Sequence, residues 1–308
     1  MFLLRGVQHV LKLQLKLRPS ARDAKAPRPL LREHGTPTSR WDRKLFDDPV
    51  PVSLGPNATC RDTMIDPRHR TQLRTTDVQV WTARVDGLHA TVEYIALLDD
   101  AERARAARFS FERDRSHYVQ SHGILRLILS GYLGVEASEL TFIRGRSGKP
   151  QLTRVSGQPP LEFSLSHSGD YCMVAVRLEK PLGVDLEKIR DVPQLIDIAH
   201  RYFTPGEHRL LASLAGAAQR DTFFALWTQK EAVVKALGQG LGDKLDQLAF
   251  ELDAMGEPQL RSCRGSLSAA CQWSVTRLSS VTGYAAAVAS LHPHDLVKER
   301  AWNIAAIA

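Results

Sequence analysis

The sequence predicts an α+β protein made of two pseudo-symmetric halves, each a long helix packed on a small antiparallel sheet, behind a disordered basic N-terminal extension. Three observations predict this class. Two long segments, 114–133 and 220–237, carry apolar residues at the i, i+3, i+4 spacing of amphipathic helices. Two pairs of apolar strands are each joined by a glycine-containing turn followed by tyrosine, in S-G-D-Y-C-M-V-A-V and T-G-Y-A-A-A-V-A. This internal repeat indicates two related halves within one chain.

The basic character of the chain lies in its first 75 residues. The full chain of 308 residues has a formal net charge of +7. Residues 1–75 hold 15 Lys and Arg against 7 Asp and Glu, whereas residues 76–308 hold 26 against 27. The first segment is rich in Pro, Arg and Thr and lacks periodicity, so we expect a largely disordered extension and linker. The rest is close to neutral, which argues against binding of nucleic acid.

Cysteine usage and hydropathy exclude other classes. The four cysteines form no C-x-x-C pair, so neither a zinc site nor a disulfide framework is expected, and the reducing cytoplasm is the expected location. No run of about 18 apolar residues occurs, so we expect no membrane-spanning helix and no membrane partner. The expected domains are the extension (1–75), the N-terminal half (76–180), the C-terminal half (181–295) and a C-terminal tail (296–308).

Within these bounds, apolar alternation predicts strands and a period of about 3.6 residues predicts helices. Strands are expected at 77–86, on both sides of the S-G-D turn within 161–176, and at 182–187, 247–252, 271–278 and 283–290. Helices are expected at 100–109, 114–133, 193–202, 205–216 and 220–237, with a turn at 145–150.

The stretch G-V-D-L-E, residues 183–187, places two carboxylates on one face of a predicted strand. Because alternate residues of a strand share a face, Val184 and Leu186 point one way, and Asp185 and Glu187 point the other. Carboxylates about 7 Å apart beside a core repel each other unless a cation lies between them, and Mg²⁺ prefers such oxygen ligands. A strand whose polar face meets water explains the same spacing.

The helix W-T-Q-K-E-A-V-V-K, residues 227–235, carries a lysine on its apolar side. Lys230 falls among the apolar positions of the helical wheel, whereas Glu231 and Lys235 lie together on the opposite face. An exposed i, i+4 pair explains Glu231 and Lys235. Lys230 either extends along apolar surface to water or reaches a cleft between the halves, where it meets an anion. Together with the two strand carboxylates, the helix also suits a site for a metal and a phosphate.

Two further stretches are candidates for phosphate contacts. In S-L-S-H-S-G-D, Ser166 and His167 are adjacent in a strand and point to opposite faces, so they do not activate each other, and no G-x-S-x-G elbow surrounds them. A hydroxyl or imidazole donating to a phosphate fits this stretch, and so does a turn whose polar groups bond one another. The basic turn R-G-R-S-G-K-P, residues 144–150, lacks the P-loop pattern and suits either a phosphate or solvent.

Taken together and in order, these stretches resemble the Sfp-type 4′-phosphopantetheinyl transferases. That family pairs a G-[IV]-D-[ILV]-E strand with a later W-[ST]-x-K-E-[AS]-x-x-K helix, matched here by G-V-D-L-E and W-T-Q-K-E-A-V-V-K. The S-H-S-G-D-Y, G-K-P and F-S-F-E-R-D-R-S-H-Y stretches also resemble the family pattern, so the resemblance covers about residues 90–290. It implies a monomeric pseudo-dimer with coenzyme A bound in the cleft between the halves.

The resemblance also implies roles for individual residues. It makes Asp185, Glu187 and Glu231 the ligands of a Mg²⁺ ion held against the pyrophosphate of coenzyme A. Glu231 and Lys235 are the expected catalytic residues: Lys235 offsets the developing charge, and either Glu231, the preferred group, or a metal-bound water accepts the proton. The cofactor-binding candidates, with Lys230 added for its place on the helical wheel, are Arg105, Arg144, Gly148, Lys149, Pro150, Ser166, His167, Lys230 and Lys235. One departure concerns Glu102, which stands where some members have a second basic residue. Another is the basic extension, which lies outside the family pattern.

The implied reaction transfers the 4′-phosphopantetheine arm of coenzyme A to a serine hydroxyl of an apo acyl or peptidyl carrier protein and releases adenosine 3′,5′-bisphosphate. Carrier proteins are acidic around that serine, so the 189–224 stretch, with Arg190, Arg201, Phe203 and Arg209, is the expected docking surface. Two other classes stay open. One is a different magnesium-dependent phosphodiester or pyrophosphate enzyme, and the other is a non-catalytic coenzyme A-binding module.

Overall fold

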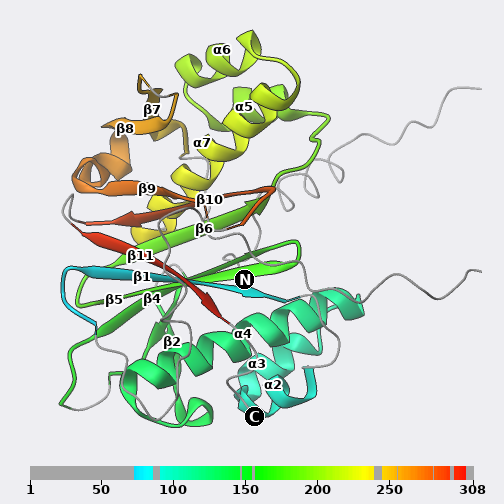
Figure 1. The fold of residues 1–308 in the computed structure, drawn as a ribbon, viewed down its shortest axis with the longest axis vertical. Helices are drawn as coiled ribbons and strands as arrows, with labels where there is room; N and C mark the ends of the chain where they lie inside the picture. The colour runs from blue at the N-terminus through cyan, green and yellow to red at the C-terminus, as the bar shows by residue number, and fades with distance from the viewer. Residues whose placement is uncertain are drawn as a thin grey trace, which may run out of the picture.

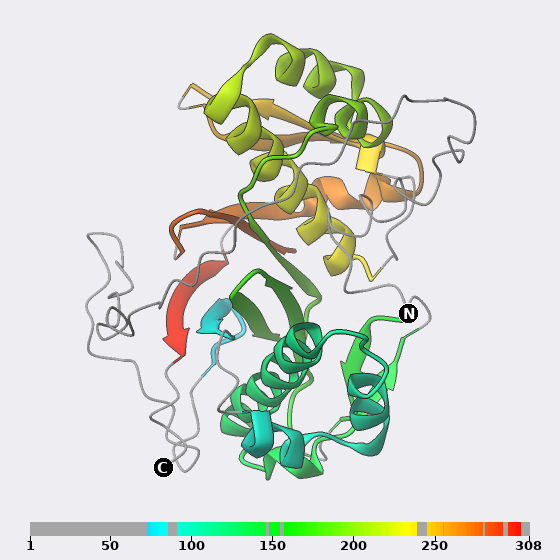
Figure 2. The ribbon, with the colours of Figure 1, turned by 90° about the vertical axis from the view of Figure 1, so that its right-hand side faces the viewer.

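Two halves stacked on each other make up the protein (Figure 1, Figure 2). The computed structural model describes residues 73–85, 91–145, 148–154, 157–238, 245–254, 256–279, 281–291 and 295–302. In Figure 1 the N-terminal half, with its long helix α4, lies below, and the C-terminal half, with α7, lies above. The expected disorder of residues 1–75 concerns a segment that falls outside the described residues except for its last three. None of the described helices is long and apolar enough to cross a membrane.

The N-terminal half is a four-stranded sheet with helices against one face. Its elements are β1 (Asp77–Arg84), α2 (Thr91–Leu97), α3 (Asp100–Ala106), α4 (Glu112–Leu133), the 3₁₀ turn η1 (Ala137–Glu139), β2 (Phe142–Arg144), β3 (Pro150–Leu152), β4 (Leu161–Ser168), β5 (Tyr171–Leu178) and β11 (Leu296–Trp302). The sheet order is β11-β1-β5-β4, with β11 parallel to β1 and the other neighbours antiparallel. The apolar stripe of α4, including Ile124 and Ile128, shares one core with Trp81 and Val174 of the sheet.

The C-terminal half is also a sheet covered by a long helix, and its sheet has three strands. Its elements are β6 (Leu182–Lys188), α5 (Leu195–Tyr202), α6 (Pro205–Ser213), α7 (Gly216–Ala236), the 3₁₀ turn η2 (Leu245–Gln247), β7 (Leu248–Leu252), β8 (Pro258–Cys263), the 3₁₀ segment η3 (Gly265–Gln272), β9 (Ser274–Leu278) and β10 (Tyr284–Ser290). The sheet order is β6-β10-β9, all antiparallel. Alternate residues of β10, Ala285, Ala287 and Ala289, share a core with α7, and their small side chains fit a closely packed helix.

The two sheets meet through an apolar core and a seam of serines. Val78, Val80, Met173 and Ala175 of one sheet share a buried cluster with Val184, Leu186, Ala286 and Val288 of the other. At the seam, the hydroxyl oxygens of alternate serines on β4 accept hydrogen bonds from alternate N–H groups of β6. The three bonds run from Val184 N to Ser164 Oγ (3.1 Å), from Leu186 N to Ser166 Oγ (3.2 Å) and from Lys188 N to Ser168 Oγ (3.1 Å). Side-chain hydroxyls thus accept hydrogen bonds from the edge N–H groups of β6. In a continuous sheet, the carbonyl groups of a neighbouring strand would accept them.

Gly183 allows α7 to lie directly against β6. A Cβ built at this position would collide with the carbonyl oxygen of Ala232 and would stand 2.5 Å from the backbone nitrogen of Ala236. Both atoms belong to the backbone of α7 and have no rotamer to change. The glycine of G-V-D-L-E is therefore a packing requirement, and it brings the next two alternate side chains of the strand under the same helix.

Gly183→Ala is expected to destabilise the fold by about 2–3 kcal/mol, because α7 must move away from β6 to admit the methyl group. Denaturant unfolding of the full chain measures this loss. Gly206→Ala on α6 is the matched control, since the nearest atom to its added Cβ is Thr204 Oγ1 at 4.0 Å. A Gly183→Ala protein as stable as the Gly206→Ala protein would contradict the packing account.

The structure confirms the predicted α+β class and corrects three details. The 296–308 stretch, for which the sequence predicts a tail, contains β11, and its parallel pairing with β1 makes the N-terminal sheet mixed rather than antiparallel. The segments α2, β2, β3 and β8 lie where the sequence pattern predicts no helix or strand. In β11 no residue is fully buried except its last, Trp302. The strand therefore has no strong apolar alternation, and only its distant partner stabilises it.

Candidate active site

Three carboxylates from two elements lie together between β6 and α7. Asp185 and Glu187 project from the face of β6 that carries Gly183, opposite the face that holds Val184 and Leu186, as strand alternation predicts. Glu231 approaches them from α7. The exposed fractions of Asp185, Glu187 and Glu231 are 2%, 4% and 1%. Such burial excludes a solvated polar strand face as the explanation of these acids.

Burial makes this cluster electrostatically costly. It is the main cause that raises the pKa of all three carboxyls, and it raises that of Glu187 from its usual 4.5 to about 7. The charge of Asp185 is the second cause for Glu187 and for Glu231, whose pKa lies well above its ordinary value. For Asp185 itself, the charge and hydrogen bond of Lys235 act in the opposite direction. The cluster therefore favours a proton or an added cation.

Lys235 and two seam serines offset part of the cost of burying these carboxylates. The Lys235 ammonium donates to Asp185 Oδ1 at 2.6 Å, to Ser166 Oγ at 2.9 Å and to the carbonyl of Val184 at 3.2 Å. Ser166 Oγ donates its own proton to Asp185 Oδ1 at 3.0 Å, and Ser168 Oγ donates to Glu187 Oε2 at 2.9 Å. The hydroxyl of Ser166 is thus committed to the acid and to backbone N–H, which is not the environment of a nucleophile.

Two carboxylate oxygens in the cluster stay uncompensated. Asp185 Oδ2 and Glu231 Oε1 are buried and have no hydrogen-bond partner among the residues that the structure describes. In the same residues, no set of three His, Cys, Asp or Glu side chains converges as a ready-made metal cage. The unmatched oxygens still fit a hard cation of the Mg²⁺ type, which needs only one or two carboxylates when other oxygens complete its shell.

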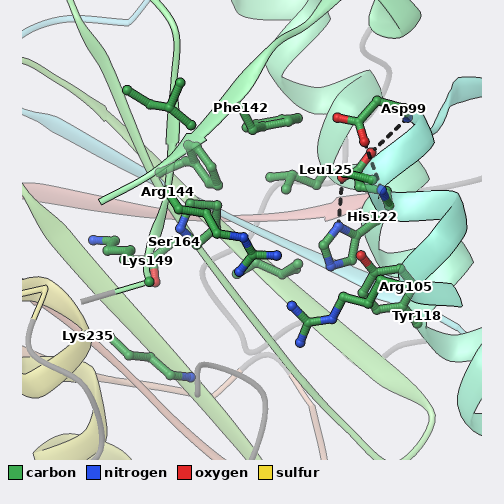
Figure 3. A pocket seen from close by; sticks show the side chains of 17 residues that line it. Asp99, Arg105, Tyr118, His122, Leu125, Phe142, Arg144, Lys149, Ser164 and Lys235 are labelled. Atoms are coloured by element: carbon green, nitrogen blue, oxygen red, sulfur yellow. Dashed lines mark hydrogen bonds and ion pairs between the residues drawn. The ribbon is translucent and has the colours of Figure 1, made fainter. Parts of the chain in front are cut away.

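A cavity of about 130 Å³ adjoins the cluster (Figure 3). Lys235 lies at one side of the view in Figure 3, and Arg105 and His122 lie at the other. The cavity is lined by Asp99, Ala101, Glu102, Arg105, Tyr118, His122, Leu125, Phe142, Ile143, Arg144, Gly148, Lys149, Pro150, Phe163, Ser164, Leu165 and Lys235. Lys235 belongs both to the cavity wall and to the acid cluster, so it links the two.

The wall of this cavity is rich in cations. The Arg105 guanidinium lies 5.5 Å from the ring centroid of Tyr118, and Arg144 follows from β2. Lys149 is buried and donates to the carbonyl of Leu182 at 2.8 Å, tying the basic turn to the start of β6. Burial is the main reason that the pKa of Lys149 falls to about 8. The turn itself places Gly148 at φ +83°, a left-handed conformation that favours glycine.

His167 lies between the seam serines but faces the opposite side of β4. Burial lowers the pKa of its imidazole to about 3, and the charges of His122, His117 and Lys235 act in the same direction. The ring is therefore neutral at physiological pH. A neutral imidazole donates one hydrogen bond and brings no charge, so His167 suits the binding of a phosphate oxygen rather than its neutralisation.

The structure corrects the assignment of Lys230 to the cleft. Its ammonium is fully buried, pairs with Glu207 Oε2 at 2.8 Å, and donates to the carbonyls of Leu245 (2.9 Å) and Leu248. All three partners belong to α6, η2 and β7 on the outer side of the C-terminal half. The ring of Phe203 lies 5.2 Å from the ammonium. Lys230 is thus neither a phosphate contact nor a side chain extending to water, but half of a buried ion pair that joins α7 to these elements.

The other sequence candidates lie in or beside the site. Arg105, Arg144, Gly148, Lys149, Pro150 and Lys235 all line the cavity, although they come from α3, β2, β3 and α7. Sequence reasoning missed Tyr118 and His122, whose rings lie 4.0 Å apart between centroids on α4. Their i, i+4 spacing places them on one face, but in the sequence it reads as part of the core stripe. Phe142 and Phe163 carry no sequence signal for a cavity, since buried aromatics are ordinary core residues.

Comparison with known proteins gives matches over both halves. The family model described as "4′-phosphopantetheinyl transferase superfamily" matches residues 181–289, and "4′-phosphopantetheinyl transferase, N-terminal" matches residues 80–179. The 4′-phosphopantetheinyl transferase HetI of Nostoc sp. is 36% identical over 214 residues, which cover 69% of this chain and 87% of that protein. The 4′-phosphopantetheinyl transferase of Bacillus subtilis is 31% identical over 51% of this chain and 68% of its own. A solved holo-(acyl-carrier-protein) synthase from Bacillus anthracis in complex with CoA (3′,5′-ADP) aligns at 20% identity and a TM-score of 0.30, covering 36% of this chain and 94% of its own.

Proposed function

This chain belongs to the 4′-phosphopantetheinyl transferase superfamily, a family of transferases, and on that premise we propose that it moves the phosphopantetheine arm of coenzyme A to a carrier protein. The acceptor would be a serine hydroxyl of an apo acyl or peptidyl carrier protein, and the by-product would be adenosine 3′,5′-bisphosphate. One observation carries the proposal. Lys235 joins a cation-lined cavity, suited to a nucleotide, to three buried acids suited to a metal and a pyrophosphate.

In this proposal the cavity holds coenzyme A. Arg105, Arg144 and the Gly148–Pro150 turn surround the nucleotide, and the pyrophosphate lies toward Lys235, Ser166 and His167. The continuity of the cavity wall from Arg105 to Lys235 supports this orientation. Guanidinium and ammonium groups suit phosphate oxygens because each adds a charge-assisted hydrogen bond to an anion.

Asp185, Glu187 and Glu231 would hold Mg²⁺. When bound, the ion would supply positive charge beside the pyrophosphate at which negative charge develops during transfer. The unpartnered buried oxygens of Asp185 and Glu231 support this assignment, since a cation would satisfy both. Lys235 would then exchange its present contact with Asp185 for the phosphate oxygens.

The chemical step needs one proton acceptor from this chain. The carrier serine oxygen forms a bond to the β-phosphorus while the bond from that phosphorus to the bridging oxygen of the pyrophosphate breaks. We assign the serine proton to Glu231, because it is the cluster carboxylate on α7 and one of its buried oxygens, Oε1, has no hydrogen-bond partner among the described residues. Lys235 would balance the charge left on the departing nucleotide. The nucleophile belongs to the partner, so no serine of this chain has to act as one.

Mass spectrometry of a panel of apo carrier proteins, incubated with the full chain, coenzyme A and Mg²⁺, tests the proposed function. The expected result is a gain of one phosphopantetheine on at least one carrier. Release of adenosine 3′,5′-bisphosphate from coenzyme A without any carrier would favour a phosphodiester enzyme instead. Binding of coenzyme A with neither product would favour a non-catalytic binding module.

Asp185→Ala is expected to raise the Mg²⁺ concentration required for half-maximal transfer about 10- to 100-fold, because one oxygen ligand is lost. Transfer rates measured across a Mg²⁺ titration give this value. The matched control is Glu251→Ala on β7, an acid whose side chain is 74% exposed, and its Mg²⁺ requirement should equal that of the unmodified chain. An unchanged requirement in Asp185→Ala would remove this residue from the proposed metal site.

The carrier surface remains a prediction with one correction. Phe203 is 3% exposed and stacks on Phe223 within the core, so it is not available to a partner. Arg201 and Arg209 are exposed on α5 and α6 and suit an acidic carrier. Action as a cytoplasmic monomer, without nucleic acid or membrane, is also a prediction. Sedimentation of the full chain tests the monomeric state. Deletion of residues 1–63 tests whether the basic segment binds nucleic acid.

A further inference from the structure

Three charged side chains, here called the Asp170 cluster, join the two halves at one end of the serine seam. Asp170, in the turn between β4 and β5, accepts from Arg113 Nη2 at 2.9 Å through Oδ1 and from Lys188 Nζ at 3.3 Å through Oδ2. Arg113 belongs to the first turn of α4 in the N-terminal half, whereas Lys188 ends β6 in the C-terminal half. These three residues are not among those that line the cavity described above, so the proposed binding of coenzyme A does not use them.

The Asp170 cluster lies next to the buried carboxylates. Ser168, which donates to Glu187 Oε2 at 2.9 Å, is two residues before Asp170, and Lys188 directly follows Glu187 in the chain. Two residues span at most about 7 Å, even when the chain is fully extended. A partner protein that brings a hydroxyl to the buried carboxylates therefore brings the surface around that hydroxyl close to the Asp170 cluster.

Two cations share one carboxylate in the Asp170 cluster, and all three side chains are accessible. Arg113, Lys188 and Asp170 are 69%, 47% and 31% exposed. Accessible ion pairs contribute little to stability, because water and ions compete for the same groups, and their partners can therefore be exchanged. The neighbouring Glu112 and Arg115 neutralise each other at 2.7 Å. The Asp170 cluster thus keeps a net charge of +1 and can accept a second carboxylate.

An exposed aromatic side chain flanks the Asp170 cluster. Phe111, two positions before Arg113, is 69% exposed, the largest fraction among the large hydrophobic side chains that the structure describes. One exposed apolar residue is ordinary by itself, but beside two cations it fits a protein surface that carries both acidic and apolar side chains. Asp114, the other acid of this turn, is rotated about 100° from Arg113 around the helix and so does not share its face.

We propose that the Asp170 cluster is a docking contact for the carrier protein, in which a carboxylate of the carrier displaces Asp170 from Arg113 and Lys188. The proposal rests on the proposed function, because its partner is a carrier that is acidic around the accepting serine. It adds a contact shared by both halves to the surface expected on α5 and α6. Asp170 is then an internal competitor, which holds both cations in place until a carrier carboxylate replaces it. A partner without such a carboxylate cannot make the exchange, so the cluster selects acidic carriers.

Calorimetric titration of the full chain with an apo acyl carrier protein, in which alanine replaces the accepting serine, tests the proposal without relying on transfer. Saturating Mg²⁺ and coenzyme A are present, since this carrier cannot consume them. Arg113→Glu is expected to raise the Kd for the carrier about tenfold, because an anion replaces one of the two cations. Asp170→Asn is expected to lower the Kd about threefold, because the competing charge is lost. Phe111→Ser is expected to raise it about threefold.

A charge reversal elsewhere controls for unspecific effects. Arg277→Glu on β9 is the matched control, since Arg277 is also an exposed arginine paired with one carboxylate, that of Glu257 at 2.5 Å, and its Kd should equal that of the unmodified chain. The affinity for coenzyme A, titrated separately, should be the same in all variants. Single acid-to-lysine changes around the serine of the carrier should, at one position or more, restore binding to Arg113→Glu.

Three results would overturn the proposal. The first is an unchanged Kd in Arg113→Glu together with a raised Kd in Arg201→Glu, which would place the carrier on α5 alone. The second is weaker binding of the carrier by Asp170→Asn, since a competitor cannot also be an attractive contact. The third is no binding of the carrier to the unmodified chain. Normal carrier binding without transfer in the mass-spectrometric assay would instead refute the proposed reaction and leave the docking contact standing.

Discussion

Glu231→Gln is expected to lower the rate of phosphopantetheine transfer at least about 1,000-fold while leaving the chain folded. The amide keeps the size of the side chain but can neither accept the serine proton nor offer Mg²⁺ an anionic oxygen. Intact-mass measurement of an apo carrier over time gives the rate. Glu251→Gln, on the exposed side of β7, is the matched control and should transfer normally. Normal transfer by Glu231→Gln would remove this residue from both of its proposed roles.

The same substitution is expected to stabilise the protein in the absence of metal. Because the pKa of Glu231 is raised in the folded state, the folded chain binds more protons than the unfolded chain once the pH exceeds about 4.5. The stability of the unmodified chain therefore falls as pH rises through that window. Glutamine does not titrate, so the advantage of the variant should be smallest in acid and should grow as pH rises through that window. Urea unfolding at several pH values measures it, and an advantage that shrinks with rising pH would contradict the electrostatic account.

Lys230→Met is expected to cost about 3–5 kcal/mol of folding stability, because it leaves the buried Glu207 carboxylate without its cation. The carbonyls of Leu245 and Leu248 lose a donor at the same time. Denaturant unfolding measures the loss. Arg103→Met removes the cation of an exposed pair with Asp100, whose side chain is 100% exposed, and should change stability by less than about 0.5 kcal/mol.

A second substitution separates the buried pair from other effects. Lys230→Met combined with Glu207→Gln removes both charges and should recover part of the lost stability. The amide oxygen introduced by Glu207→Gln can still accept from Phe250 N, as the Glu207 carboxylate does at 2.8 Å. The folded fraction of either variant should bind coenzyme A with unchanged affinity. A Lys230→Met protein of normal stability and reduced coenzyme A affinity would contradict this account and would support a contact between Lys230 and the ligand in the cleft.

Local periodicity was sufficient to predict which residues of β6 share a face. In G-V-D-L-E, strand alternation alone separates the acids from Val184 and Leu186, and the structure confirms those faces. The family expected from this motif and from the helix motif is confirmed by the relatives. The roles of the individual acids and of Lys235 stay predictions, to be decided by the variants described above.

Long-range contacts explain what the sequence could not provide. A helical wheel shows that Lys230 faces an apolar side, but its partner Glu207 comes from another helix, and no period within α7 reveals which element covers that side. The pairing of β11 with β1 joins the two ends of the part of the chain that the structure describes. Likewise, His122 and Glu102 both line the cavity, but the contact between them, at 2.9 Å, joins two helices twenty positions apart. In each case the deciding neighbour is set by tertiary packing.

The seam of serines between β4 and β6 has a mechanical consequence. Its three hydroxyls are evenly spaced along β4, because side chains on one face of a strand recur every two residues, about 6.6 Å. A shift of one residue would leave the N–H groups of Val184, Leu186 and Lys188 without these acceptors, at about 1–3 kcal/mol for each of the two that are buried. The seam therefore fixes the register of β6 against β4, and it holds Asp185 and Glu187 beside Ser166 and Ser168.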